Sequence, residues 1–236
     1  MTDNLKTNLA AIADQFAHQG NITDIQAFGS GNINDTFLVS LDDPSSTRFV
    51  LQRINTQVFQ QPTLVMQNIR TFTEHVRDRL QRTPLNRRWE VPCVILTKDA
   101  QDHWNAADGS FWRAIGFIEG SESFDALNDV DRAREVGYAL GMFHNLIGDL
   151  PPENLADTLE GFHITPLYLH YYDKVLAKTC VSHAPEVEYC LKFVSDRASW
   201  AHVLENAKTQ GKLPLRLMHG DPKVNNVMFD TATGKA

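Results

Sequence analysis

The chain has 236 residues, of which 42% are apolar and 22% are charged, a composition typical of a globular protein with one large or two modest cores. Its formal net charge of −7 argues against a nucleic-acid-binding protein, because such proteins usually present a basic face. The negative charge is compatible with a cationic substrate, although many cytosolic enzymes are acidic as well.

The cysteines and the N-terminal segment indicate a reducing, cytoplasmic setting. Cys93, Cys180 and Cys190 form no C-x-x-C pair, and so sparse a set suits a reducing compartment. The first 20 residues lack the basic flank and apolar segment of a signal peptide. No stretch approaches the roughly 18 consecutive apolar residues of a membrane span. We therefore expect a cytoplasmic protein.

The first half of the chain predicts an antiparallel sheet with one inserted helix. Apolar residues at helical spacing predict a first helix over residues 5–18, and the pattern then changes to that of strands. The other expected elements are strands at 25–28, 36–39, 48–54 and 91–97, a helix over 62–80, and a hairpin over 103–118 that turns at Asp108-Gly109.

The second half predicts mainly helices. The expected elements are helices over 131–150, 166–179 and 185–208, followed by short strands at 215–218 and 227–229. The whole chain therefore predicts an α+β, two-lobe fold. We expect a β-rich lobe at 1–119 and a helical lobe at 120–236.

The strongest motif lies between the last two expected strands and reads LMHGDPKVNNVMF, from Leu217 to Phe229. A strand delivers Asp221 to a loop and the next strand starts at Asn226, so a rigid support directs a carboxylate and an amide toward one spot. Phosphoryl transfer uses such a pair, because the carboxylate accepts the proton of the attacking hydroxyl and the amide oxygen helps to hold Mg²⁺. Alternatively, both residues only cap a turn, and Asn225 is a competing amide.

The spacing from His219 to Asn226 matches the protein-kinase loop H-R-D-x-x-x-x-N, with Gly220 in place of the arginine. These residues resemble the H-G-D-x-x-x-x-N loop of the aminoglycoside phosphotransferase and choline kinase superfamily. The resemblance implies a protein-kinase-like fold that uses ATP and Mg²⁺. It also implies that Asp221 is the catalytic base and a metal ligand, and that Asn226 is a magnesium ligand.

A glycine-rich segment, FGSGNINDTF from Phe28 to Phe37, lies between the first two expected strands. Glycines let backbone N–H groups approach phosphate oxygens closely. The position of a protein kinase's third glycine holds an asparagine, so a plain hairpin turn is the alternative. Together with the catalytic motif, the segment predicts a loop over the ATP phosphates. The candidate nucleotide-binding residues here are Gly29, Ser30, Gly31, Asn32, Asn34 and Thr36.

The strand at 48–54 is where kinases place a cation that holds the ATP phosphates and pairs with a helix glutamate. This strand has no lysine, and Gln52 and Arg53 lie on its opposite faces. Arg53 is the candidate, because a guanidinium can bind phosphate oxygens in a fork, with Glu74 as a possible partner. An exposed edge arginine is the alternative. If Gln52 faces the nucleotide instead, the phosphate is held in a different way.

The end of the β-rich half supplies one more candidate. Residues 117–120, Phe-Ile-Glu-Gly, follow the last strand, and in kinase-like folds this linker offers backbone groups to adenine. Glu119 is therefore a candidate nucleotide-binding residue, although a solvent-facing linker residue would look the same.

Within the superfamily, residues 29–37, 49–55 and 161–163 look most like the N-acetylhexosamine 1-kinase branch. That resemblance implies phosphorylation of a sugar at its anomeric hydroxyl. From the net charge and the lack of a long apolar stretch, we expect no nucleic-acid or membrane partner. The alternatives are another acceptor, namely an aminoglycoside, a choline-like amine, homoserine or thioribose, or a catalytically silent nucleotide-binding fragment.

A kinase carries its second magnesium carboxylate just after a return strand, which would begin here near Lys235. We therefore expect a C-terminally truncated chain that binds Mg·ATP weakly and that exposes an apolar face over residues 160–205.

Overall fold

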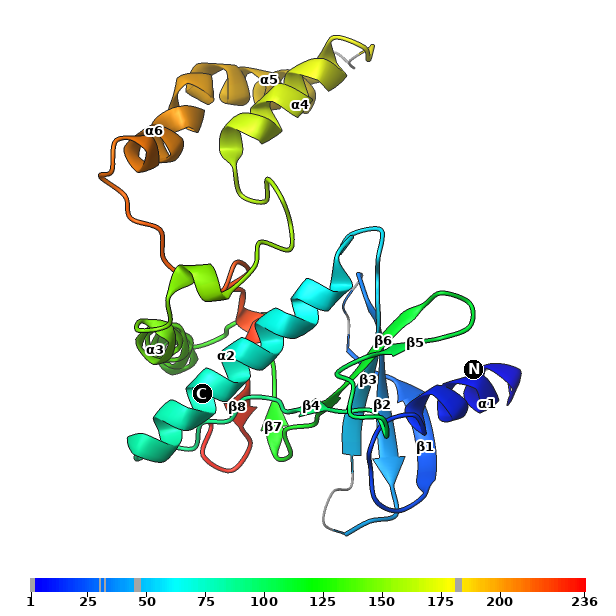
Figure 1. Cartoon of the computed structure of the whole chain (residues 1–236). Coiled ribbons are helices and arrows are strands. Elements are labelled where there is room, and N and C mark those ends of the chain that lie inside the picture. Colours follow the sequence, from blue (N-terminus) through cyan, green and yellow to red (C-terminus); the bar gives the residue numbers. More distant parts are fainter. Residues whose placement is uncertain (1–2, 30, 32, 45–47, 181–183) are drawn as a thin grey trace. The chain divides into compact units, whose positions relative to one another are not determined.

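The computed structural model describes residues 3–29, 31, 33–44, 48–180 and 184–236 (Figure 1). It contains two compact units, one formed by Met1–Thr158 with Leu217–Ala236 and the other by Leu159–Arg216. The predicted α+β class and antiparallel sheet are confirmed. The first unit contains the sheet, residues 120–158 and the loop over residues 219–226 that holds the predicted catalytic motif, called the catalytic loop below. The boundary between the units therefore differs from the expected lobe boundary at residues 119–120.

An antiparallel sheet of six strands forms the centre of the first unit. Its strand order is β1-β2-β3-β6-β4, and β5 pairs with β6 at one end. The strands are β1 (Ile22–Ala27), β2 (Asp35–Leu41), β3 (Arg48–Ile54), β4 (Val94–Ile95), β5 (Trp104–Asn105) and β6 (Phe111–Gly116). The strand expected over 91–97 keeps only two residues, because β4 pairs with β6 solely through Val94 and Ile95.

Helix α1 (Asp3–Ala13) covers one face of this sheet. Leu9 and Ile12 of the helix pack against Phe49 and Leu51 of β3, and all four side chains are buried. The helix ends earlier than expected, because Phe16 leaves it to form a β-bridge with Thr97 and is fully buried.

Helix α2 (Pro62–Arg82) packs on the other face. Met66 of this helix lies in a buried cluster with Ile54 of β3 and Phe111 of β6. Pro62 suits the first turn of a helix, where its missing N–H would have no partner. Farther along, Val76 packs against the C-terminal end of α3 (Val130–Ile147), so α2 joins the sheet to the helical part of the unit.

The catalytic motif follows a different path from the predicted strand–loop–strand. Residues 215–218 form no strand, because Leu215 and Met218 are exposed, 72% and 68%, and Pro214 has no N–H to donate. Leu217 packs instead against the α2–α3 cluster. The second strand is shorter than expected: β8 (Phe229–Asp230) follows the 3₁₀ turn η3 (Val224–Asn226) and pairs with β7 (Ser121–Glu122).

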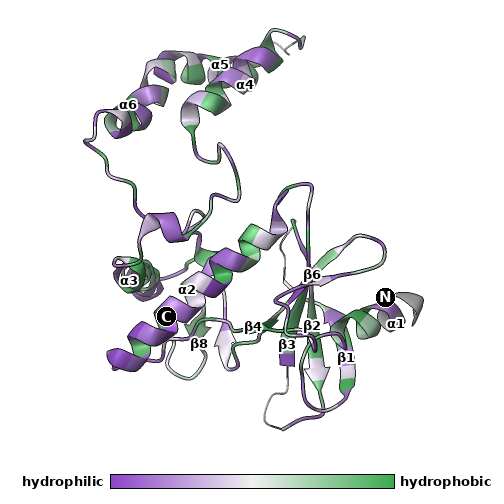
Figure 2. Cartoon of the chain, viewed as in Figure 1, coloured by the Kyte–Doolittle hydropathy of each residue, from purple (hydrophilic) through white to green (hydrophobic). Residues whose placement is uncertain are grey.

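The second unit consists of short helices. They are α4 (Thr165–Leu176), α5 (Pro185–Arg197), the 3₁₀ segment η2 (Ala198–His202) and α6 (Val203–Thr209), and the first unit has one further 3₁₀ turn, η1 (Pro152–Asn154). The single helix predicted over 185–208 is therefore wrong, because η2 interrupts it. Apolar and polar residues intermix on these helices (Figure 2), and none of the unit's described residues is buried. Among the described residues of the whole chain, no helix is both long and apolar enough to cross a bilayer.

Candidate active site

A glycine bends the chain at the catalytic loop. Gly220 has a φ of +81°, a conformation that side chains with a Cβ adopt at a cost. The residue before it is held by α3, because the His219 ring meets the Phe143 ring edge-on with 5.3 Å between centroids. The backbone N–H of Asp221 then donates to His219 Nδ1 over 3.3 Å. The histidine therefore supports the bend that presents Asp221.

The loop brings the side chains of Asp221 and Asn226 together. Asn226 Nδ2 donates to Asp221 Oδ2 over 3.1 Å and to the Asp221 carbonyl over 2.8 Å. The 3₁₀ turn η3 makes this possible, because it shortens the five-residue path between them. Both residues are exposed, so their remaining oxygens are accessible to a ligand. The competing amide, Asn225, points elsewhere and donates to Asp125 Oδ1 over 3.2 Å.

Lys223 is part of the site although the sequence motif did not single it out. Its Nζ lies 3.1 Å from Asp221 Oδ2. This hydrogen bond, followed by that from Asn226, lowers the pKa of the Asp221 carboxyl below its usual value. The ionised carboxylate is thus favoured by an adjacent cation. The sequence could have indicated this contact, because Lys223 lies only two positions after Asp221 in the same motif.

The glycine-rich loop connects β1 and β2 as predicted. The N–H of Phe28 donates to the Thr36 carbonyl over 2.9 Å and closes the loop at its base. Gly29 has a φ of +77°, and no described residue lies within 4 Å of the place where a Cβ of Gly29 or Gly31 would be. Asn34 is engaged, because its Oδ1 accepts from the backbone N–H of Asn55 over 2.9 Å. The predicted positions Ser30 and Asn32 lie outside the described residues.

A row of polar side chains crosses the sheet on the α2 face. Thr36, Gln52 and Arg113 are register partners on β2, β3 and β6. Gln52 Nε2 donates to Thr36 Oγ1 over 2.8 Å, and Gln52 Oε1 accepts from Arg113 Nε and Nη2 over 3.0 and 2.7 Å. All three are partly buried. On the α2 face of β3, next to the predicted Arg53, Gln52 therefore holds Arg113 of the neighbouring strand β6.

Arg53 lies on the opposite face of β3, the face that carries Phe49 and Leu51 and that α1 covers. Its Nε donates to Asp35 Oδ2 over 2.6 Å, and both side chains are half exposed. Its proposed partner also lies apart, because Glu74 is an exposed residue of α2 and accepts from Arg70. The structure therefore does not bring Arg53 and Glu74 together.

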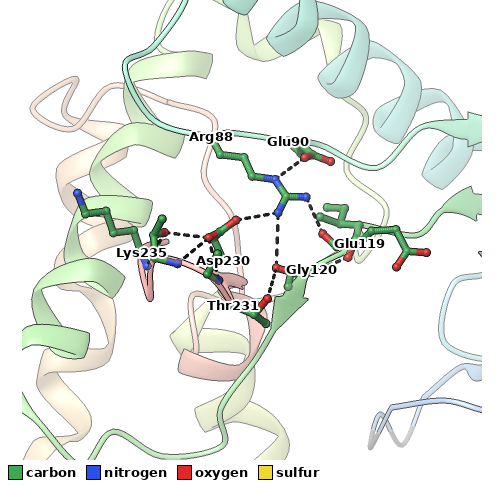
Figure 3. A network of polar contacts seen from close by, with 11 residues as sticks. Arg88, Glu90, Glu119, Gly120, Asp230, Thr231 and Lys235 are labelled. Atoms are coloured by element: carbon green, nitrogen blue, oxygen red, sulfur yellow. Dashed lines mark hydrogen bonds and ion pairs between the residues drawn. The ribbon is translucent and has the colours of Figure 1, made fainter.

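The linker after β6 is held from both sides. Arg48 of β3 forms a two-pronged ion pair with the Glu119 carboxylate, and its guanidinium lies 4.4 Å from the Phe117 ring centroid. Arg88 Nη2 donates to the Glu119 carbonyl over 2.6 Å, as Figure 3 shows. Arg48 shares its strand face with Gln52, so the linker and the polar row lie on the same side of the sheet.

Figure 3 also shows how the linker is tied to the segment after the catalytic loop. Arg88 Nη1 donates to Asp230 Oδ2 over 2.9 Å, and Thr231 N donates to the Gly120 carbonyl over 2.9 Å. Asp230 Oδ1 accepts from Thr233 in the following turn. These partners, Arg88 first, lower the pKa of the Asp230 carboxyl to about 2. One oxygen of its carboxylate thus binds Arg88 and the other binds the turn.

Residues 24–236 match the family described as Phosphotransferase enzyme family, APH. The chain belongs to this family. Among solved structures it is similar to a spectinomycin phosphotransferase in complex with ADP and spectinomycin, with 13% identity and a TM-score of 0.54. It is also similar to an aminoglycoside phosphotransferase from Alicyclobacillus acidocaldarius, with 12% identity and a TM-score of 0.47.

These matches cover most of this phosphotransferase-family chain but less of the other proteins. The spectinomycin enzyme aligns with 94% of this chain, which spans 64% of that protein. The Alicyclobacillus protein aligns with 81% of this chain, which spans 50% of it. The likeness to the spectinomycin enzyme supports the kinase-like fold.

The phosphotransferase-family chain has a cavity of about 550 Å³ behind the catalytic loop. Apolar residues line most of it, and several of them come from α2 and α3, among them Ile69, Phe72 and Phe143. The catalytic loop borders it through His219, Lys223 and Asn226. Asp221 is not among its lining residues. An apolar lining of this kind does not suit a triphosphate, so the cavity is not the candidate phosphate site.

The donor set of the loop fits a magnesium ion bound together with a nucleotide. Mg²⁺ usually takes one or two protein oxygens and completes its shell with water and phosphate oxygens. Asp221 and Asn226 offer a carboxylate and an amide from one exposed loop. No cluster of three or more His, Cys, Asp or Glu side chains capable of holding a metal occurs in the described part of the chain. A metal site at this loop would therefore share its ion with the nucleotide.

Proposed function

We propose that this chain carries the nucleotide-binding and catalytic parts of a kinase that transfers the γ-phosphate of ATP to a hydroxyl of a small molecule. The observation that carries the proposal is the contact between Asp221 and Asn226, 3.1 Å from Oδ2 to Nδ2, on a loop bent at Gly220. Family membership over residues 24–236 supports it.

In this proposal Asp221 accepts the proton of the attacking hydroxyl and orients its oxygen toward the phosphorus. The hydrogen bond from Lys223 lowers the pKa of the Asp221 carboxyl further below neutral pH, so the group that accepts the proton is the carboxylate. Asn226 and Asp221 would hold Mg²⁺, which neutralises charge on the phosphate oxygens when it is bound. The loop at residues 29–36 covers the phosphates, and the linker at 117–120 receives the adenine.

We further propose that the acceptor is a sugar, with an N-acetylhexosamine phosphorylated at its anomeric hydroxyl as the first candidate. The support is the resemblance of residues 29–37, 49–55 and 161–163 to the N-acetylhexosamine 1-kinase branch. An aminoglycoside is the second candidate. It is favoured by the similarity to a spectinomycin phosphotransferase and by the net charge of −7, which suits a cationic acceptor.

A phosphorylation assay with ATP and a panel of acceptors tests both the reaction and the acceptor. The panel contains N-acetylglucosamine, N-acetylgalactosamine, spectinomycin, kanamycin and choline, and product formation is followed by phosphorus NMR. A phosphate ester on the anomeric oxygen would support the sugar kinase, and a phosphorylated antibiotic would support the second candidate. Absence of any product together with absence of ATP binding would refute the proposed function.

Replacing the proposed base tests its role directly. Asp221→Asn should lower kcat by about 10²- to 10⁴-fold, because general-base catalysis supplies about that factor. The affinity for ATP measured without Mg²⁺ should change little, because the amide keeps the size of the side chain and no metal contact is involved. An unchanged kcat for Asp221→Asn would exclude this residue as the base. The matched control is Asp196→Asn, at an exposed helical position of the second unit, which should leave kcat unchanged.

A further inference from the structure

Phosphoryl transfer needs a cation near the nucleotide phosphates, and β3 carries a glutamine at the inward position. Gln52 shares its strand face with Arg48, which binds the linker through Glu119. Contacts then lead from the same face toward the catalytic loop. Ile54 packs on α2, α2 packs on α3, and Phe143 of α3 meets the His219 ring. The Gln52 face is therefore the one turned to the catalytic loop.

Arg113 brings a positive charge to this face. It lies on β6 directly opposite Gln52, and two of its nitrogens donate to Gln52 Oε1. Its orientation is therefore fixed, because Gln52 is itself bonded to Thr36 at the base of the glycine-rich loop. The row leads from the arginine to the loop across three adjacent strands.

Among the residues that the structure describes, the charge of Arg113 has no acidic partner. No carboxylate forms an ion pair with it within the described ranges 3–29, 31, 33–44, 48–180 and 184–236. Burial lowers the pKa of this guanidinium to about 10, so it stays protonated at neutral pH. A partly buried cation without a counter-charge is costly, and an incoming anion would relieve that cost. Arg53, by contrast, already has Asp35 as its partner.

We propose that Arg113, held in place by Gln52, is the cation that binds the ATP phosphates in this chain. It takes the part that a strand-β3 lysine has in kinases, from the neighbouring strand and with a glutamine as its support. The inference rests on the proposed kinase function and adds a residue that the sequence did not indicate. Gln52 acts as a positioning residue, because it orients the guanidinium and keeps two of its donors occupied.

Calorimetric titration of the full chain with ATP and, separately, with adenosine tests the assignment in the presence of Mg²⁺. Arg113→Met should weaken ATP binding by about 10- to 100-fold, the loss expected for a hydrogen bond to a charged group. Adenosine affinity should not change, because adenosine has no phosphate. Arg134→Gln, at an exposed position of α3, is the matched control and should bind both ligands as wild type does.

A second variant guards against simple misfolding. The double variant Gln52→Lys/Arg113→Met moves the cation to β3. It should bind ATP at least tenfold more tightly than Arg113→Met alone. Arg53→Gln should weaken ATP binding less than Arg113→Met does.

Equal ATP affinity for wild type and Arg113→Met would overturn the inference. So would an equal loss for ATP and adenosine without recovery in the double variant, which would make Arg113 a purely structural residue. A wild-type chain that binds neither ligand would instead refute the proposed function, and this inference with it. The two failures are therefore distinguishable.

Discussion

At the scale of single residues, the site depends on how two charges share one short loop. Asp221 is exposed, yet its carboxylate accepts from both Lys223 and Asn226. Each contact favours the ionised form, so the carboxyl has a lowered pKa. Protonation of Asp221 should consequently not limit activity at neutral or mildly acidic pH.

The contribution of Lys223 can be measured. Lys223→Met should raise the pKa of the Asp221 carboxyl toward its usual value, because the first and largest favourable contact of the carboxylate is lost. A carbon-13 NMR titration of the aspartate carboxyl groups measures this shift. Lys212→Met, at an exposed position of the second unit, should leave the Asp221 titration in place. An Asp221 pKa that is the same in Lys223→Met and wild type would contradict the assigned contact.

The residues of the site differ in how far the sequence could predict them. Asp221 and Asn226 could be predicted, because one short loop with fixed spacing contains both. Alternation along β3 also predicted that Gln52 and Arg53 face opposite ways. It could not predict which face meets the catalytic loop, because α1 and α2 decide that through distant contacts. Arg113 was missed for the same reason, since 61 positions separate it from Gln52.

At the scale of elements, Arg88 joins three segments that are distant in the sequence. It bonds Glu90 next to it, the carbonyl of Glu119 in the linker, and Asp230 at the end of β8. The pairing of β7 with β8 thus has a charged anchor beside its few backbone hydrogen bonds. Two-residue strands have little stability of their own. The Arg88–Asp230 ion pair, called the Asp230 anchor below, therefore helps to hold the linker next to β8.

The Asp230 anchor predicts a specific acid dependence of stability. The carboxyl has a pKa of about 2 in the folded chain and an ordinary value of 3.8. A lowered folded pKa gives stability that is present above pH 3.8 and is lost as the pH falls toward 2. Wild type should therefore be more stable than Asp230→Asn at pH 7, and the difference should disappear between about pH 4 and pH 2.

Urea unfolding curves at a series of pH values measure that difference. In an Arg88→Met background, the stability difference between chains without and with Asp230→Asn should change less with pH. The reason is that Arg88 is the first cause of the lowered pKa of Asp230. A difference between wild type and Asp230→Asn that is constant from pH 7 to pH 2 would contradict the anchor.

Elements with their own periodicity could be predicted from the sequence, and those that depend on a partner could not. The helix over 62–80 and the strand over 48–54 match α2 and β3 closely. Residues 215–218 are mostly apolar, but no strand in the described part of the chain pairs with them, so they remain irregular. The helical pattern of residues 185–208 likewise does not show where the helix is interrupted. The interruption, η2, contacts α4 as well as α5 and α6.

At the scale of the whole molecule, the two units differ in how they bury apolar side chains. The first unit has clusters on both faces of its sheet. In the second unit, large apolar side chains remain accessible, among them Tyr189, Trp200 and Leu204, with exposed fractions of 69%, 68% and 61%. Apolar surface that stays exposed adds nothing to stability in water. We therefore expect the backbone amides of the second unit to be less protected from hydrogen exchange than those of the first.

Hydrogen exchange should show this difference. Backbone amides of α4 and α5 should exchange faster than those of β2 and β3, because local opening of the second unit exposes little new apolar surface. Exchange followed by mass spectrometry of peptides from the intact chain measures both regions in one sample. Equal protection of α5 and β3 would show that the second unit is stabilised by contacts of another kind.

The pairing of Gly120 with Thr231 also affects the order in which the chain can mature during translation. The Gly120 carbonyl accepts from the Thr231 hydroxyl, and 111 positions separate the two residues. At a synthesis rate of roughly 5 to 20 residues per second, the ribosome needs on the order of 5 to 20 seconds to pass from one to the other. The strands of the sheet are synthesised long before that, so the Gly120 carbonyl has no Thr231 hydroxyl to bind until the segment that carries Thr231 has been added.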